Sequence, residues 1–87
     1  MSISGSILLH DGDYVFTGWD SRDMVIFSVV TRLDTEGEVI WENSWESHFN
    51  NDEIIETTDS GIAICGYRNF DVWIKKFNME GEEQHSW

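Results

Sequence analysis

Few residues of this 87-residue chain have the types and spacing that enzyme chemistry requires. Three histidines lie far apart along the chain: His10, His48 and His85. They share no metal-ligand spacing and lie near the ends of apolar runs, which indicates surface or edge positions. One short stretch, "SWESH", crowds four polar candidates together: Ser44, Glu46, Ser47 and His48. Nucleophilic catalysis needs a base held against a hydroxyl and oriented by a third group. Crowding alone provides no such arrangement, so we expect that the protein is not an enzyme.

Two acidic stretches that contain glycine, "HDGD" and "DTEGE", resemble fragments of calcium loops. A complete calcium loop needs about six oxygen ligands in register and ends in a bidentate Glu, and neither stretch has that set. Turn formation explains the same residues, because an Asp or Asn side chain can cap a turn and the glycine can adopt φ > 0. We therefore expect no metal and no cofactor. The expected turn glycines are Gly12, Gly37, Gly61 and Gly81.

The composition indicates one small globular domain. Hydrophobic residues make up 40% of the chain and include five Trp, five Phe and two Tyr, which is enough for a packed core. No segment approaches the roughly 20 apolar residues that cross a bilayer, and the N-terminus lacks the basic region of a signal peptide. The single Cys65 excludes an internal disulfide and is predicted to be a small buried hydrophobe. These features favour a cytoplasmic protein.

The chain is strongly acidic, and its charge is uneven. Seventeen Asp and Glu residues against five Lys and Arg give a formal net charge of −12. This charge disfavours direct binding to nucleic acid or to an anionic membrane. Nine of the acids, and no Lys or Arg, lie between Leu33 and Tyr67. Alternate residues of an extended strand share a face, so part of this stretch is predicted to form an acidic row. The candidate partner-binding residues are Glu38, Glu42, Glu46, Asp52, Glu53 and Glu56.

The sequence repeats itself almost from end to end. Gly18 aligns with Gly66 at an offset of 48, and Gly37 aligns with Gly81 at an offset of 44. The difference of four is an insertion in the first copy, within "WDSRDMVIF". We place one repeat at residues 1–47 and the other at residues 48–87, within one structural domain.

Each repeat is predicted to form four antiparallel strands, so the fold class is all-β. Turn residues separate apolar runs at hairpin spacing, and Pro is absent. The expected strands cover residues 6–10, 13–19, 24–33, 38–45, 52–58, 61–67, 71–78 and 82–87. The second strand of each copy is apolar on both faces, whereas the fourth strand of the first copy alternates, with Val39, Trp41 and Trp45 on one face. Inner strands covered on both sides beside a half-exposed outer strand are typical of a β-propeller blade.

The second copy resembles the repeats of a bacterial and archaeal β-propeller family. Those repeats run as an apolar pair, a D-G-G-like turn, an apolar strand ending in Gly-Tyr, D-V-W, a Lys-bearing strand, a D-x-x-G turn and a Trp. The matching positions are Ile54, Ile55, Asp59, Gly61, Gly66, Tyr67, Asp71, Val72, Trp73, Lys75, Gly81 and Trp87. In the first copy they are Asp11, Gly12, Tyr14, Gly18, Trp19, Leu33, Asp34, Gly37 and Trp41. The chain departs from the pattern through its insertion and through His85, where a Trp is expected unless the alignment slips to Trp87. The resemblance implies a fold and a binding or display scaffold, not a chemistry.

Two blades do not close a propeller, which typically has four to eight. Each blade also leaves an apolar face that only a neighbour can cover, and soluble monomers avoid such patches. We therefore expect a homotrimer with six blades or a homotetramer with eight. The residues expected to pack the blades are Trp19, Trp41, Trp73, Tyr67, Ile64 and Val72. A self-contained eight-stranded sandwich or barrel is the alternative.

The sequence leaves several functions open. The first is a non-catalytic propeller module that assembles with itself and presents an acidic surface to a protein partner, which would then be basic. The second is a small acidic inhibitor, or nucleic-acid mimic of the phage counter-defence type, that blocks a basic nucleic-acid-handling protein. The third is an enzyme with its active site at the centre of the ring, although no motif in the chain requires one. The chain could also be a fragment or engineered piece of a longer propeller. Under a purely structural interpretation, the acidic stretch is a solvated edge that deters aggregation.

Overall fold

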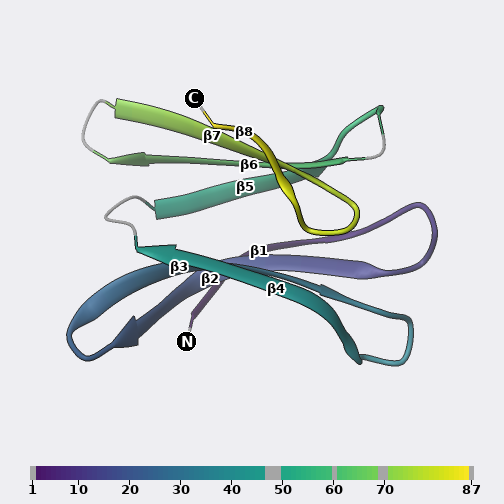
Figure 1. Ribbon diagram of the computed structural model, residues 1–87, viewed down its shortest axis with the longest axis horizontal. Helices are drawn as coiled ribbons and strands as arrows, with labels where there is room; N and C mark the ends of the chain where they lie inside the picture. The colour runs from purple at the N-terminus through teal and green to yellow at the C-terminus, as the bar shows by residue number, and fades with distance from the viewer. Residues whose placement is uncertain (1, 47–49, 60, 69–70, 87) are drawn as a thin grey trace.

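The computed structural model describes residues 2–46, 50–59, 61–68 and 71–86. These residues form an all-β fold of two four-stranded antiparallel sheets, each with its strands in chain order (Figure 1). The first sheet holds β1 (Ser2–Leu8), β2 (Tyr14–Arg22), β3 (Val25–Leu33) and β4 (Val39–Glu46). The second holds β5 (Asn50–Glu56), β6 (Gly61–Arg68), β7 (Asp71–Asn78) and β8 (Glu83–Ser86). Within the described ranges, no helix has the length and apolar character needed to cross a membrane.

The β3–β4 and β7–β8 hairpins turn in the same way. Asp34 Oδ1 accepts hydrogen bonds from the backbone N–H groups of Glu36 and Glu38, each at 2.9 Å. Asn78 Oδ1 accepts the two equivalent bonds in the second sheet, at 3.0 and 2.9 Å. Gly37 and Gly81 then adopt φ of 85°, a left-handed conformation that side chains disfavour. The repeated Asp/Asn-x-x-Gly motif therefore encodes the same turn twice.

The other two expected turn glycines differ from each other. Gly12 has φ of 98° in the turn closed by the bond from Leu9 N–H to Asp13 C=O. Gly61 is not among the glycines with positive φ, and it begins β6. A Cβ at Gly61 would lie 2.9 Å from the carbonyl oxygen of Phe77, so a close approach between strands, and not backbone conformation, requires a glycine at this position.

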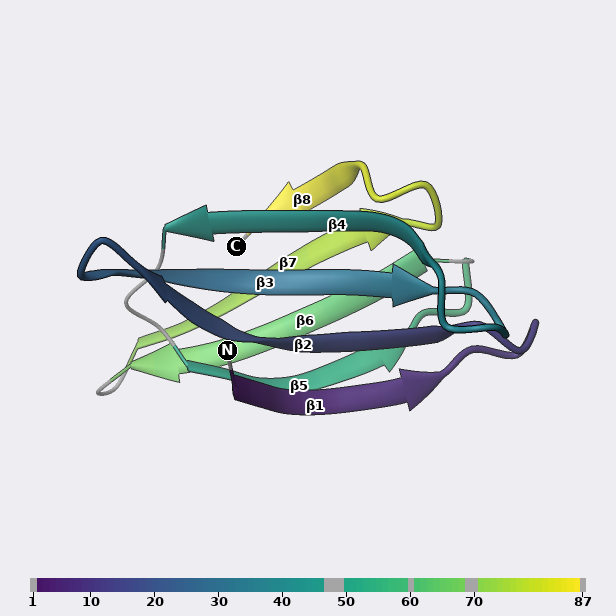
Figure 2. The same ribbon diagram turned by 90° about the horizontal axis from the view of Figure 1, so that it is seen from below.

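The two sheets stack face to face with their strands in the same order, with β1 beside β5 at one edge and β4 and β8 both at the other edge (Figure 2). The backbones approach most closely at the edge formed by β1, β2 and β5. Toward β4 and β7, large aromatic rings fill the space between the sheets. Trp41 stacks on Phe77 at a centroid distance of 6.3 Å, and Trp45 meets Trp73 edge-on at 6.0 Å. The indole and phenyl rings between β4 and β7 hold the sheets further apart there than at the β1–β5 edge, which gives the two-sheet unit the shape of a wedge.

The hydrophobic core lies between the sheets and is formed by alternate residues of the inner strands, together with one residue of the β1–β2 turn and one of β5. The first sheet contributes Leu9, Val15 and Val30, and the second contributes Ile54, Ile62, Ile64 and Phe77. All are less than 9% exposed. Burying each such side chain stabilises the fold by roughly 1.5–3 kcal/mol, so the stacked arrangement is held mainly by apolar burial.

Two strand details differ from the sequence prediction. The ladder between β3 and β4 shifts register, so that Arg32 pairs with Trp41 whereas Leu33 pairs with Val39. This β-bulge inserts Ile40 as an extra residue and turns Val39 away from the face that Trp41 occupies, so the expected shared face is wrong for Val39. β1 also begins earlier than expected, at Ser2, and ends at Leu8 because Leu9 already belongs to the turn.

The two turn glycines allow a matched test of how closely the sheets fit. A Cβ at Gly81 would lie 2.6 Å from Trp41 Cδ2, whereas a Cβ at Gly37 would meet no atom within 4 Å. Gly37→Ala is therefore expected to cost about 1–2 kcal/mol, from the left-handed backbone alone. Gly81→Ala should cost about 1–3 kcal/mol more, because Trp41 must shift. Urea unfolding at low chain concentration measures both values, and equal losses would contradict the close fit at Gly81.

Candidate functional site

The most extensive polar cluster of the described residues joins the two sheets and centres on Arg32 of β3. Its guanidinium donates to Asp11 Oδ2 at 2.9 Å and to Asp13 Oδ2 at 2.7 Å, both in the β1–β2 turn. A third bond, of 2.7 Å, reaches the main-chain oxygen of Met79 in the second sheet. Arg32 is only 9% exposed, and a buried cation is tolerated when carboxylates and carbonyls pair with it in this way.

Two further side chains of β4 bind the same turn of the second sheet. Trp41 Nε1 donates to the Met79 carbonyl oxygen at 2.7 Å. The side-chain amide of Asn43 donates to the carbonyl oxygen of Gly81. The β7–β8 turn is thus held through its backbone oxygens by three side chains of the first sheet. Because the acceptors are main-chain atoms, another turn of the same shape can bind such side chains in the same way.

A histidine and a glutamate join the sheets beside this cluster, between the β1–β2 turn and the end of β5. The His10 backbone N–H donates to Glu56 Oε1 at 3.0 Å, and its ring Nδ1 pairs with Glu56 Oε2. His10 remains exposed, whereas Glu56 is half-buried between the sheets. The hydrogen bond that the Glu56 carboxylate accepts from the His10 ring raises the pKa of His10 above its ordinary value of 6.5. This pair is therefore a pH-sensitive contact between the sheets.

Each sheet also has a free face that is apolar and unpartnered in this single chain. On the first sheet, Leu8 is 62% exposed and Tyr14 is 48% exposed, beside the half-buried Phe16 and Leu33. These residues share a face because paired residues of neighbouring strands point the same way, as the pairing of Tyr14 with both Leu8 and Leu33 requires. We call this surface the first free face.

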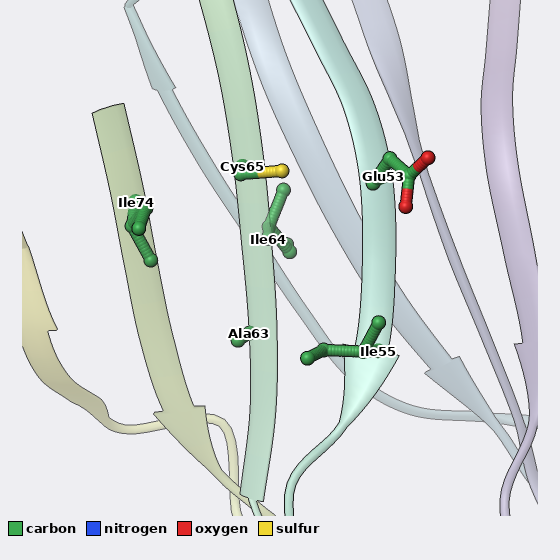
Figure 3. Close-up of a pocket in the computed structure, with 6 residues that line it drawn as sticks. All are labelled: Glu53, Ile55, Ala63, Ile64, Cys65 and Ile74. Atoms are coloured by element: carbon green, nitrogen blue, oxygen red, sulfur yellow. The ribbon is translucent and has the colours of Figure 1, made fainter. Parts of the chain in front are cut away.

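The second free face lies on β5, β6 and β7. Ile55 is 55% exposed and Ile74 is 39% exposed, and with Ala63 and Cys65 they line a shallow hollow of about 240 Å³ (Figure 3). Cys65 is half-buried, and not fully buried as expected, because nothing covers this face. Ordinary soluble monomers avoid large exposed apolar patches, so both free faces are candidate interaction surfaces.

The acidic residues predicted to bind a partner are spread over several surfaces. The six residues are Glu38, Glu42, Glu46, Asp52, Glu53 and Glu56. Glu42 and Glu46 point outward from β4 on the first free face, and Glu42 accepts a 2.9 Å hydrogen bond from Thr31 Oγ1. Glu53 lies on the second free face, and Glu56 lies between the sheets. Glu38 is exposed in the β3–β4 turn, and the side chain of Asp52 lies outside the described residues. The described residues of this set therefore do not form one continuous acidic surface.

The residues expected to pack the repeats are placed as follows. Trp41, Trp73 and Ile64 lie between the sheets, against or within the core. Trp19 is 43% exposed at the edge of the same space. The side chains of Tyr67 and Val72 lie outside the described residues.

The candidates for catalysis and metal binding are not brought together in the described part of the chain. Ser44 accepts a 3.4 Å hydrogen bond from Arg22 on the exposed side of β4, where Glu46 is also exposed. Ser47 and His48, and the side chain of His85, lie outside the described residues. Among the residues that are described, no group of three or more His, Cys, Asp or Glu side chains could hold a metal ion.

Arg32 was not among the predicted site residues, although the sequence carries a signal for it. Lys76 aligns with Arg32 at the offset of 44 that also aligns the turn glycines Gly37 and Gly81. It forms an ion pair with Asp59, which aligns with Asp11 at the offset of 48. A buried strand that carries a cation at one position in both repeats indicates a structural ion pair, and the structure shows this pair in each sheet.

Comparison of the chain with protein-family models, with curated proteins and with solved structures found no match to any of the three.

Removing the central cation should weaken the junction between the sheets. We expect Arg32→Met to lower the free energy of unfolding by roughly 3 kcal/mol, because it leaves Asp13 half-buried without its cation and removes one of the two side-chain hydrogen bonds to the Met79 carbonyl. Arg22→Met is the matched control, since Arg22 pairs with Asp20 at the surface, where a single ion pair is worth about 1 kcal/mol or less. Urea unfolding of both variants checks the expectation, and similar losses would contradict it.

The His10–Glu56 pair predicts a specific pH dependence. Because the pKa of His10 is raised in the folded state, its stabilisation is complete below the unfolded pKa of about 6.5 and is lost as the pH rises through the folded pKa. A histidine NMR titration should give a pKa above 6.5 for His10 in the wild type and a value near 6.5 in Glu56→Gln. An unchanged pKa in the variant would exclude Glu56 as the cause.

Proposed function

We propose that this chain is a non-catalytic building block of a β-propeller, in which several copies close a ring that serves as a protein-binding scaffold. A trimer would supply six sheets and a tetramer eight, within the range of known propellers. The observation that carries the proposal is the stacking of two sheets in the same strand order with an apolar face left free on each side.

The wedge shape supports a closed ring over an open stack. The sheets approach closely near β1 and β5, whereas indole and phenyl rings fill the space toward β4 and β7. Repeating such a wedge turns each sheet a little relative to the last, with β1 and β5 toward a common axis. A succession of wedges with one constant rotation closes into a ring when that rotation divides a full turn evenly and carries no shift along the axis; otherwise it forms an open helix.

The acidic surface of the proposed scaffold is best placed on the hairpin turns. Glu36 and Glu38 are exposed in the β3–β4 turn, and Glu80 and Glu82 are exposed at the equivalent positions of the β7–β8 turn. Both turns lie at the same end of the strands (Figure 2). A ring would repeat these carboxylates around one rim, where they would attract a basic protein partner through long-range charge.

The first experiment is native mass spectrometry or light scattering across a salt series. Under the proposal, the mass is three or four times that of one chain and survives high salt, because apolar contacts are not screened. An assembly that dissociates as salt rises would contradict closure through the apolar faces.

A monomer at every salt concentration would favour the second candidate function, a small acidic inhibitor of a basic nucleic-acid-handling protein. The observation that supports this alternative is the net charge of −12 on so short a chain. Its binding would then fall steeply with salt, as for other charge-driven contacts.

A further inference from the structure

The two sheets of the chain face the same way. Val15 pairs with Arg32 on the face of the first sheet that the second sheet covers. By the repeat offsets of 48 and 44, the equivalent residues of the second sheet are Ala63 and Lys76, which also pair with each other. That second pair, however, lies on the second free face, beside Ile55. The covered face of one sheet thus corresponds to the free face of the other.

The opposite faces correspond in the same manner. Ile62 and Phe77 form the covered face of the second sheet and are buried in the core. Their equivalents in the first sheet are Tyr14 and Leu33, which pair with each other on the first free face. Each free face therefore matches, position by position, a face that is already packed inside the chain.

From this correspondence we infer that the second free face of one copy binds the first free face of another, and so repeats the internal contact between chains. The inference rests on the proposed function for its partner, a second copy of this chain, and it adds which faces meet. The contact is front to back, not between two identical patches, and it continues the interface that already joins the two sheets.

Polar groups for this contact are already in position. Inside the chain, Arg32 pairs with Asp11 and also reaches the Met79 carbonyl of the following turn. On the second free face, Lys76 pairs with Asp59, and the turn residue equivalent to Met79 is Thr35. The Thr35 carbonyl of a second copy is therefore the expected acceptor for Lys76.

The turn that would be bound also has room for its partner. Trp41 lies directly against Gly81, whereas the equivalent Gly37 has no atom within 4 Å of a would-be Cβ. The residue equivalent to Trp41 is His85, whose side chain lies outside the described residues. In the contact between chains, the β8 residue of the neighbouring copy that is equivalent to Trp41 would occupy the space next to Gly37.

Charge favours front-to-back contact over a contact between two first free faces. Glu42 and Glu46 point outward from β4 on the first free face, so two such faces would bring carboxylates together. The second free face carries one carboxylate, Glu53, and the Lys76–Asp59 ion pair. Like-charge contacts across an interface are unfavourable, so a contact between two first free faces is disfavoured.

Two variants that each block one face test the inference. Ile74→Lys blocks the second free face and Tyr14→Lys blocks the first, and both side chains are exposed enough for the fold to survive, at 39% and 48%. Met24→Lys is the control, because Met24 is 98% exposed in the β2–β3 hairpin, away from both faces. Equal urea midpoints for the three variants under dissociating conditions would show that the fold is intact. Ile55→Lys blocks the second free face at a second position and should have the same effect as Ile74→Lys.

Native mass spectrometry then gives the chain number for each variant and for a mixture of the two, with one of them ¹⁵N-labelled. We expect single chains from Ile74→Lys alone and from Tyr14→Lys alone. The mixture should give a two-chain species that holds one of each variant, because each supplies the face that the other lacks. Met24→Lys should retain the mass of the wild type.

Other outcomes overturn the inference. A homodimer of Tyr14→Lys would mean that two second free faces bind each other, and a homodimer of Ile74→Lys would mean the same for the first free faces. A mixture that stays single-chained while the wild type assembles would also refute it. If the wild type forms open, growing assemblies and the mixture still gives the mixed two-chain species, ring closure fails and the front-to-back contact stands.

Discussion

A β-sheet with apolar side chains on both faces needs a neighbour on each side, and this constraint governs the structure of the chain. The inner strands β2, β3 and β6 carry apolar residues in succession, so no single neighbour can cover them. Stacking the two sheets buries one face of each and leaves the other face of each in water. The core, the turn contacts and the free faces all follow from this division.

The way in which the two sheets meet is set by a few large or charged side chains. Trp41 and Trp45 fill the wide part of the space between the sheets, and Arg32 ties the β1–β2 turn and the β7–β8 turn to the same point. The acceptors in the second turn are backbone oxygens, whose positions depend on the left-handed Gly81. The β7–β8 turn and the indole ring of Trp41 that packs against it thus fix the stacking of the sheets.

Much of the fold could be predicted from local sequence, whereas the details of the site could not. Turn residues and alternation gave the strands, the hairpins and the division into two sheets. The bulge at Ile40 reversed the expected face of Val39, because register depends on the partner strand and not on local pattern. The six acidic candidates looked contiguous in sequence, but Glu56 lies between the sheets while Glu42 and Glu53 point to opposite outer faces.

The sequence by itself determined the all-β class and the shape of each β3–β4 and β7–β8 turn, because these depend on period-two patterning and on residues four apart. Only the tertiary structure decided which face of each sheet is covered, and that Arg32, which was not among the predicted site residues, holds the junction together with the His10–Glu56 pair. Those outcomes depend on contacts between residues more than forty positions apart, such as Arg32 with Met79. A local pattern shows that a face is apolar, but only the packing of the sheets shows which apolar face remains free.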